Sequence, residues 1–169
     1  MNAEHNQFMA LAIEEARAGM RGGDRPFGSV VIRDGKVVGR GHNQVVSALD
    51  PTAHAETQAI RNAAATLKAA RLDGCTMYTS CEPCPMCFGA TLYAGIGTLV
   101  IGTRLTSIVR FSKGLYNINE YTVERLNELT GGTLSIISGV MSEESDAMYR
   151  DWPGWNSYPM GGETRGKAR

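Results

Sequence analysis

The four cysteines of this 169-residue chain all lie within one stretch of thirteen positions, from Cys75 to Cys87. The last three of them, Cys81, Cys84 and Cys87, follow one another at intervals of three residues. A secreted disulfide framework spreads its cysteines so that they join distant segments of the chain. The clustering therefore indicates metal or redox chemistry in a reducing compartment, and we expect a cytoplasmic protein.

Two short segments together favour a catalytic zinc site. In Pro83–Cys87, the sulfurs of Cys84 and Cys87 would lie one turn apart at the start of a helix, where the helix dipole favours thiolates. His54 would supply a third ligand from the start of another helix. A catalytic zinc takes three protein ligands of these types and keeps a fourth position for water. Glu56 would then lie beside that water as a general base and later as a general acid.

Other interpretations of these cysteines stay open. Cys84 and Cys87 alone could form a redox pair, as Cys-x-x-Cys does in some cytoplasmic α/β proteins. Adding Cys81 could give an iron–sulfur cluster, but this needs a fourth cysteine, for which Cys75 is the candidate. A closed structural zinc site also needs a fourth ligand. We interpret Cys81 as a small packed residue, because a fourth ligand would fill the position that water needs.

Apolar spacing and turn residues predict an alternation of helices and strands. Helices are expected over 3–19, 50–70, 82–94, 120–129 and 143–150, and strands over 29–32, 37–41, 76–79, 98–102 and 133–138. Asp34-Gly35 predicts a tight hairpin between the first two strands. Strands separated by helices favour a layered α/β fold with a mixed sheet, whose first pair is antiparallel.

Composition limits the partners that the chain can have. Seventeen basic and seventeen acidic residues give a formal net charge of zero, which argues against a general nucleic-acid or membrane-surface binder. No apolar run approaches the roughly 18 residues of a membrane span, and the first residues lack the layout of a secretory signal. Without a repeat or a linker, we predict one domain over 1–158 and a polar, mobile tail over 159–169.

The motifs resemble those of the cytidine deaminase superfamily and, within it, are most similar to bacterial guanine deaminases and plant guanosine deaminases. The resemblance runs from about residue 8 to about residue 103 and is carried by Pro26–Gly28, Gly41–Asn43, Asp50–Glu56 and Thr79–Cys87. His-x-Glu with Pro-Cys-x-x-Cys is the signature of zinc deaminases that act on nucleobases. The resemblance implies a three-layer α/β/α fold with a mixed five-stranded sheet, and a homodimer.

The resemblance also implies roles for particular residues. Asn43 matches an asparagine that hydrogen-bonds the ring, a task that suits an amide because it both donates and accepts. Phe27 and the Ala55 backbone match positions that line the ring pocket. Carried over in the same way are the Zn²⁺ ligands His54, Cys84 and Cys87 and the proton shuttle Glu56.

After residue 103 the chain departs from the guanine deaminase pattern. Guanine deaminases carry an acidic Gly-Phe-Asp-Asp stretch there, where this chain has Arg110–Leu115, and they carry tryptophan at the position of Tyr93. Fungal cytosine deaminases share an Asp-Trp pair near the C-terminus, here Asp151-Trp152. The aromatic segment Tyr149–Tyr158 would either close the pocket as a lid over a planar base or pack against the sheet. We predict Tyr93 and Trp152 as substrate contacts.

The predicted function is the hydrolytic deamination of an aminated nucleobase, with guanine, which gives xanthine and ammonia, as the first choice. Cytosine, guanosine or another aminated heterocycle is the alternative small substrate. Editing of adenosine in tRNA would require a basic surface for the phosphates, and a zinc-stabilised module without catalysis is a further alternative. We expect a small-molecule substrate and a second copy of the chain as partners, with no nucleic acid and no membrane.

Overall fold

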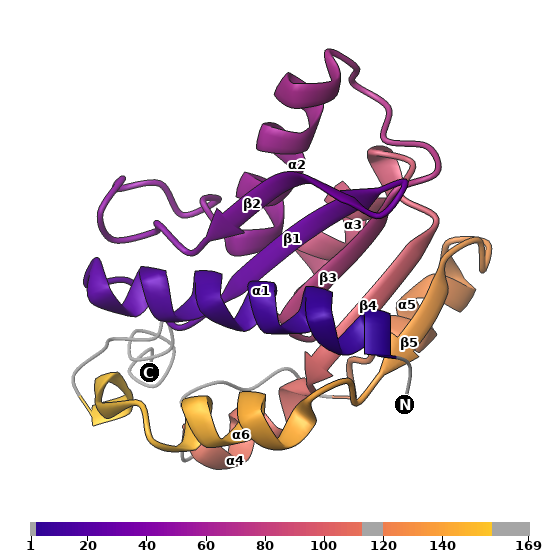
Figure 1. Cartoon of the computed structure of the whole chain (residues 1–169). Helices are drawn as coiled ribbons and strands as arrows, with labels where there is room; N and C mark the ends of the chain where they lie inside the picture. The colour runs from indigo at the N-terminus through magenta and orange to yellow at the C-terminus, as the bar shows by residue number, and fades with distance from the viewer. Residues whose placement is uncertain (1–2, 113–119, 157–169) are drawn as a thin grey trace, which may run out of the picture.

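The computed structural model describes residues 3–112 and 120–156, and its five strands form one mixed sheet (Figure 1). The strand order is β2-β1-β3-β4-β5. The bounds are β1 Gly28–Arg33, β2 Lys36–His42, β3 Thr76–Cys81, β4 Thr98–Thr103 and β5 Ser135–Ser138. β1 is antiparallel to both β2 and β3, whereas β3, β4 and β5 run parallel. The predicted mixed sheet of five strands is confirmed, and the predicted tail at 159–169 lies outside the described residues.

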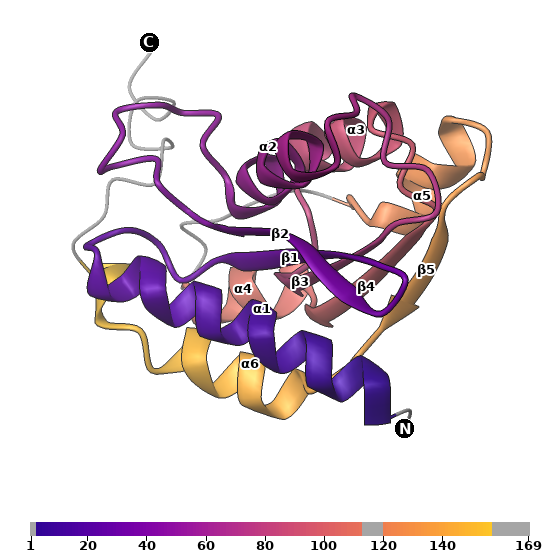
Figure 2. The ribbon, with the colours of Figure 1, turned by 45° about the horizontal axis from the view of Figure 1, so that its top comes forward.

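Helices cover both faces of this sheet, which confirms the three-layer α/β/α architecture (Figure 2). On one face lie α2 (Ala55–Leu67), α3 (Pro85–Tyr93) and α5 (Val123–Leu129). On the other lie α1 (Ala3–Arg21) and α6 (Ser142–Arg150), with α4 (Leu105–Phe111) beside α6. Parallel strands need such crossover helices, whereas the β1–β2 hairpin needs only a tight turn. Asp34 and Gly35 make that turn with φ of 50° and 68°, as its two central residues require.

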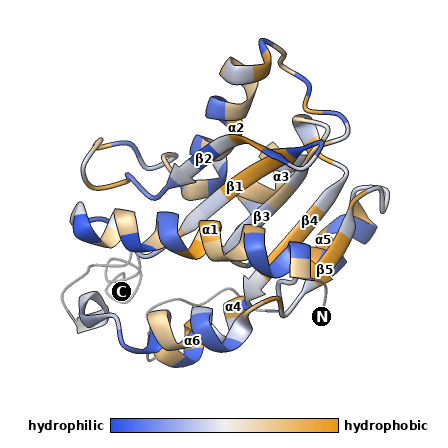
Figure 3. Cartoon of the chain, viewed as in Figure 1, coloured by the Kyte–Doolittle hydropathy of each residue, from blue (hydrophilic) through white to orange (hydrophobic). Residues whose placement is uncertain are grey.

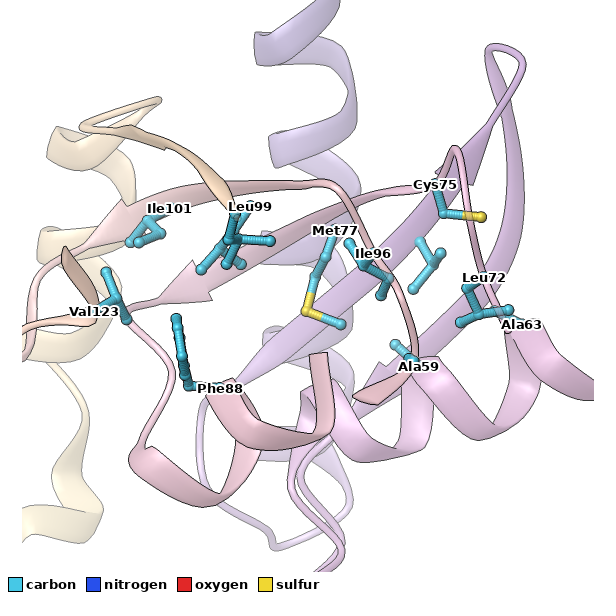
Figure 4. Close-up of a cluster of buried hydrophobic side chains, with 13 residues drawn as sticks. Ala59, Ala63, Leu72, Cys75, Met77, Phe88, Ile96, Leu99, Ile101 and Val123 are labelled. Carbon is cyan, nitrogen blue, oxygen red and sulfur yellow. The ribbon is translucent and has the colours of Figure 1, made fainter. Parts of the chain in front are cut away.

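An apolar cluster holds α2 and α3 against the sheet. Met77, Leu99 and Ile101 extend from β3 and β4 toward Phe88 of α3 and Ala59 of α2, and all five are fully buried (Figure 4). On the opposite face, the buried residues of α1 recur at helical spacing, and hydrophilic residues alternate with hydrophobic ones along this helix (Figure 3). Among the described residues, no helix combines the length and the apolar character that crossing a membrane requires.

The predicted starts of α2 and α3 were wrong by about one turn. α2 begins at Ala55 rather than at residues 50–52, because the Asp50 carboxylate accepts the N–H of Thr52 at 2.8 Å and forms a local turn instead. α3 begins at Pro85, so Pro85 rather than Pro83 takes the first helical position, where a missing N–H costs nothing. The two corrections move His54 and Cys84 to the positions that cap the helices.

The prediction also missed a helix. α4 has seven residues and follows β4 after a single residue, Arg104. The sequence predicted no element between residues 102 and 120, because an apolar stripe over so short a segment is too weak to indicate a helix. α4 matters for the site because its first residue, Leu105, is buried beside it.

β2 lies so close to α2 that their contact requires glycine. A Cβ atom on Gly41 would be 2.3 Å from the carbonyl oxygen of Ala55 and 2.4 Å from the backbone nitrogen of Ala59. A Cβ atom on Gly39 would meet the same helix at similar distances. These glycines therefore set how near the first turn of α2 comes to the sheet.

Replacing Gly41 by alanine is expected to lower the free energy of unfolding by about 1–3 kcal/mol, because the added methyl group pushes α2 away from β2. Urea denaturation of the zinc-loaded protein measures this change. Gly89→Ala in α3 is the matched control, since a Cβ atom there meets nothing within 4 Å and alanine favours a helix. Equal stability of the two variants would show that the close contact is not required.

Candidate active site

Three potential metal donors meet at the N-terminal ends of α2 and α3. His54 caps α2 and Cys84 caps α3, both with extended backbone, and neither side chain makes a capping hydrogen bond. Cys87 follows in the first turn of α3 and is fully buried. Their ligand atoms all lie within 4.8 Å of one another.

The distances within this group fit a tetrahedral zinc ion. Nδ1 of His54 lies 3.6 Å from Sγ of Cys84 and 3.5 Å from Sγ of Cys87. Zinc with bonds of about 2.3 Å to sulfur and 2.0 Å to nitrogen would hold a sulfur and a nitrogen ligand roughly 3.5 Å apart at the tetrahedral angle. In the described part of the chain the group has three protein donors, which is the number found in catalytic zinc sites.

The two sulfurs differ in their protonation. The hydrogen bond from Cys87 lowers the pKa of Cys84 to about 4, and His54 adds to this effect. The same hydrogen bond, followed by burial, raises the pKa of Cys87. For His54, the hydrogen bond to Cys84 raises the pKa, and burial opposes this. The Cys84 thiolate is therefore ready to bind a cation, whereas Cys87 must release a proton when a metal binds.

Glu56 places a buried carboxyl group beside the donors. It is the second residue of α2 and only 6% exposed. Burial raises the pKa of Glu56 to about 7, and the negative charge of Cys84 acts in the same direction. A carboxyl group with a pKa near neutrality can both accept and release a proton at physiological pH.

Cys81 takes no part in the metal group. It ends β3, is buried, and packs in a cluster with Leu105, Ile108 and Tyr149. Burial raises the pKa of the Cys81 thiol well above its usual range. This environment suits the interpretation of Cys81 as a small packed residue.

His54, Cys84 and Glu56 line a pocket whose other side is formed by the sheet, whereas Cys87 is fully buried and does not line it. Phe27 precedes β1 and Asn43 follows β2, and the backbone N–H of Asn43 donates to the carbonyl of Phe27 at 3.0 Å. The residues that line the pocket are Arg25, Phe27, Asn43, His54, Glu56, Cys81, Glu82, Cys84 and Leu105. Two of the predicted substrate contacts, Phe27 and Asn43, are therefore brought together with the donors.

The other three predicted contacts do not line this pocket. Ala55, the first residue of α2, is fully buried where this helix contacts β2. Tyr93 is the last residue of α3 and 88% exposed, about 12 Å along the helix from its N-terminal end. Trp152 is buried against Trp155, with ring centroids 4.7 Å apart. Within the described residues Trp152 packs against its neighbours, and its role as a substrate contact stays a prediction.

The segment around Trp152 supports the pocket wall from behind. The Tyr149 ring lies 5.5 Å from the Phe27 ring, and its hydroxyl group is 2.7 Å from Ser80 Oγ. Ser80 Oγ in turn accepts the N–H of Gly28 at 3.0 Å. Trp155 donates its indole N–H to the carbonyl of Tyr149. The aromatic residues thus position Phe27 without entering the pocket.

Sequence analysis missed three pocket residues, namely Arg25, Glu82 and Leu105. Glu82 is buried, and its carboxylate accepts the N–H groups of Leu105 at 3.0 Å and Val123 at 2.9 Å, so it joins the starts of α4 and α5 to the cysteine loop. The sequence did offer a signal for Glu82, because a charged residue that directly follows an apolar strand is a candidate for a buried, hydrogen-bonded group. Leu105 could not be placed while α4 was unknown.

Comparison with known protein families identifies one matching family model. It is described as the cytidine and deoxycytidylate deaminase zinc-binding region, and it matches residues 2–103, which include the three donors and Glu56. A guanine deaminase of Bacillus subtilis is 48% identical over 91 residues, which are 53% of this chain and 58% of that protein. A tRNA-specific adenosine deaminase of Buchnera aphidicola is 37% identical over 111 residues, or 66% of this chain and 68% of that protein.

Solved structures related to guanine deaminases and to tRNA deaminases share the fold of this chain. A guanine deaminase from Nitrosomonas europaea superposes with a TM-score of 0.76 and 26% identity, covering 90% of this chain and 85% of that one. A structure from a study of A-to-I editing by tRNA:A34 deaminases gives a TM-score of 0.70 and 29% identity, covering 84% and 98%. The fold and the zinc-binding region are therefore common to relatives whose names differ in the substrate.

Proposed function

Because this chain belongs to the family of cytidine and deoxycytidylate deaminases with a zinc-binding region, we propose that it deaminates a free nucleobase by hydrolysis, with guanine as the substrate and xanthine and ammonia as the products. The observation that carries this proposal is one pocket in which the buried carboxyl group of Glu56 lies with His54 and Cys84, which form a donor group with Cys87. Three donors suit zinc, and the carboxyl group supplies the proton transfers that hydrolysis of an amine needs.

In the proposed mechanism, His54, Cys84 and Cys87 would hold zinc, which would supply a Lewis acid and lower the pKa of water. Glu56 accepts a proton from a water molecule as the oxygen of that water forms a bond to the amine-bearing carbon. Glu56 then delivers the proton to the neighbouring ring nitrogen. A second proton transfer through Glu56 lets the carbon–nitrogen bond break, so that ammonia leaves and the carbonyl forms. Glu56 ends in the ionisation state in which it began.

Two residues on the sheet side orient the ring in this proposal. Asn43 is fully buried, and its amide group can hydrogen-bond the ring. The Phe27 ring provides an apolar wall for a planar base. Guanine is favoured among the possible rings because the guanine deaminase of Bacillus subtilis is 48% identical over 91 residues of this chain. The homodimer and the cytoplasmic location stay predictions.

Deamination of adenosine in tRNA is the second candidate function, and it is favoured by relatives such as the 37% identical enzyme of Buchnera aphidicola. Such an enzyme must bind phosphates, which requires clustered basic side chains. The net charge of this chain is zero. We therefore favour the small base.

Ammonia release by the purified, zinc-loaded protein tests the two candidates directly. The panel holds guanine, guanosine, cytosine, cytidine, adenine, isoguanine, pterin and aminotriazines, together with a tRNA sample. We expect guanine to be converted far faster than guanosine or tRNA. Turnover of tRNA alone would establish the second candidate, and zinc binding without turnover of any compound would indicate a non-catalytic module.

A further inference from the structure

Arg25 lines the pocket but has no part in the reaction proposed above. It lies two residues before Phe27, and its side chain is half-buried. Among the described residues that line the pocket, Arg25 is the only arginine or lysine, so it carries the only permanent positive charge there. A guanidinium group next to a ring-binding site has five N–H donors and no acceptor.

The backbone on both sides of Arg25 is held in place. The buried carboxylate of Asp24 accepts the N–H groups of Val46 at 2.8 Å and Ser47 at 3.2 Å. The carbonyl of Arg25 accepts the N–H of Phe27 at 2.8 Å. A Cβ atom on Gly19 would lie 3.1 Å from that carbonyl, so α1 passes directly beneath it. The backbone of Arg25 is therefore held in a fixed position at the pocket.

The pocket has two sides with different tasks. His54, Glu56 and Cys84 come from the first residues of α2 and α3, and in the proposed function they face the amine-bearing carbon. Arg25 and Asn43 come from the other side, where the start of β1 pairs with the end of β2. A planar ring whose reacting carbon faces Glu56 therefore turns another edge toward Arg25 and Asn43.

That side of the pocket offers hydrogen-bond donors. The side-chain carbonyl of Asn43 accepts the N–H of Val45 at 3.2 Å, which leaves the amide N–H₂ for the pocket. The guanidinium group of Arg25 adds a fork of two parallel N–H donors. A ring edge with two adjacent acceptors, an oxo oxygen and an unprotonated ring nitrogen, matches such a fork, as O6 and N7 of guanine do. An amino group in place of the oxo group would place its N–H donors opposite the N–H donors of the guanidinium group, so that no hydrogen bond could form there.

We infer that Arg25 determines specificity by selecting bases that carry an oxo group next to a ring nitrogen on the edge away from the reacting carbon. This inference rests on the proposed function and deepens it, because it names the substrate class as oxo-bearing aminated bases such as 6-oxopurines. Arginine and lysine are not equivalent in this role, since lysine keeps the charge but loses the fork.

A pair of substrates that differ only at this edge tests the inference. Guanine and 2,6-diaminopurine share the 2-amino group, but one carries an oxo group and the other an amino group at position 6. We expect Arg25→Gln to lower kcat/KM for guanine by about 10- to 100-fold, the discrimination typical of one bidentate contact, and for 2,6-diaminopurine by less than about threefold. Arg25→Lys should lie between the parent and Arg25→Gln. Arg21→Gln, at an exposed arginine on α1, is the control.

The ratio of the loss in kcat/KM for guanine to the loss for 2,6-diaminopurine distinguishes a role in specificity from a structural role. A structural defect lowers kcat/KM for both bases equally, and that result, or no loss for guanine, would overturn the inference. Binding tests it without turnover, by titration calorimetry of both bases with Glu56→Gln and with Glu56→Gln/Arg25→Gln. If the parent deaminates neither base but guanine binding still depends on Arg25, the proposed function fails and the inference stands. If Arg25→Gln lowered the affinity for a tRNA anticodon stem-loop but for neither base, Arg25 would be assigned to phosphate binding, and the inference would be overturned.

Discussion

Replacing Glu56 by glutamine is expected to lower kcat by about 10²- to 10⁴-fold, the usual contribution of a positioned general acid and base, while zinc stays bound. Glutamine has nearly the same shape as glutamate, but it can neither accept a proton from water nor pass one to the leaving amine. Glu56 is not a member of the donor group. Its side chain is buried, and replacing a buried carboxyl group by an amide adds no charge to the interior.

Three measurements check this prediction. Ammonia release gives kcat, mass spectrometry of the metal gives the zinc content, and circular dichroism reports the fold. Glu128→Gln in α5 is the matched control, because this exposed glutamate lies outside the pocket and should leave kcat unchanged. Full activity in a folded, zinc-loaded Glu56→Gln protein would exclude Glu56 as the proton shuttle.

The second large effect is expected from Cys87→Ala, which should remove zinc and reduce deamination below detection. Two donors bind zinc far more weakly than three, and without the metal nothing lowers the pKa of the attacking water. The protein should also become less stable, because a bound ion stabilises the folded state by about 4 kcal/mol when its free concentration is a thousand times Kd. Treating the parent protein with a chelator should produce the same loss of activity, and added zinc should restore it.

The two other buried cysteines provide matched controls. Cys75 is buried in the core beside Leu72 and Met77, and Cys81 packs against Leu105, both outside the donor group. Cys75→Ala and Cys81→Ala should each lose a little stability through a small cavity but keep one zinc ion per chain. Loss of zinc in Cys81→Ala would identify Cys81 as a ligand, and full zinc content in Cys87→Ala would exclude the proposed donor set.

The metal donors could be predicted because their geometry is set locally. Cys84 and Cys87 are three residues apart, so any helix that starts between Pro83 and Pro85 brings both sulfurs to one side. His54 and Glu56 are two residues apart, so both are held at the start of α2, His54 as its N-cap and Glu56 in its first turn. The error of about one turn in both helix starts did not affect this prediction, because spacing within a motif does not depend on the exact first residue of the helix.

The remainder of the pocket depends on contacts between distant segments. Arg25, Asn43 and Leu105 reach it from three places in the chain, and no spacing rule connects them. The tertiary structure also excludes Tyr93 from the pocket, because α3 carries this residue away from its N-terminal end. Trp152 could not be placed from the sequence, since a buried aromatic residue and a stacking residue follow the same pattern.

The amino-acid sequence by itself therefore determined the alternation of elements, the mixed sheet and the zinc chemistry, all of which follow from short-range spacing and from residue type. Only the tertiary structure added Arg25, Glu82 and Leu105 to the predicted pocket residues Phe27 and Asn43. Their place at the pocket depends on how closely the sheet and helices pack, as Gly41 against Ala55 shows. The residues that we propose to orient the substrate also depend on the tertiary structure, because packing, rather than sequence proximity, brings them together.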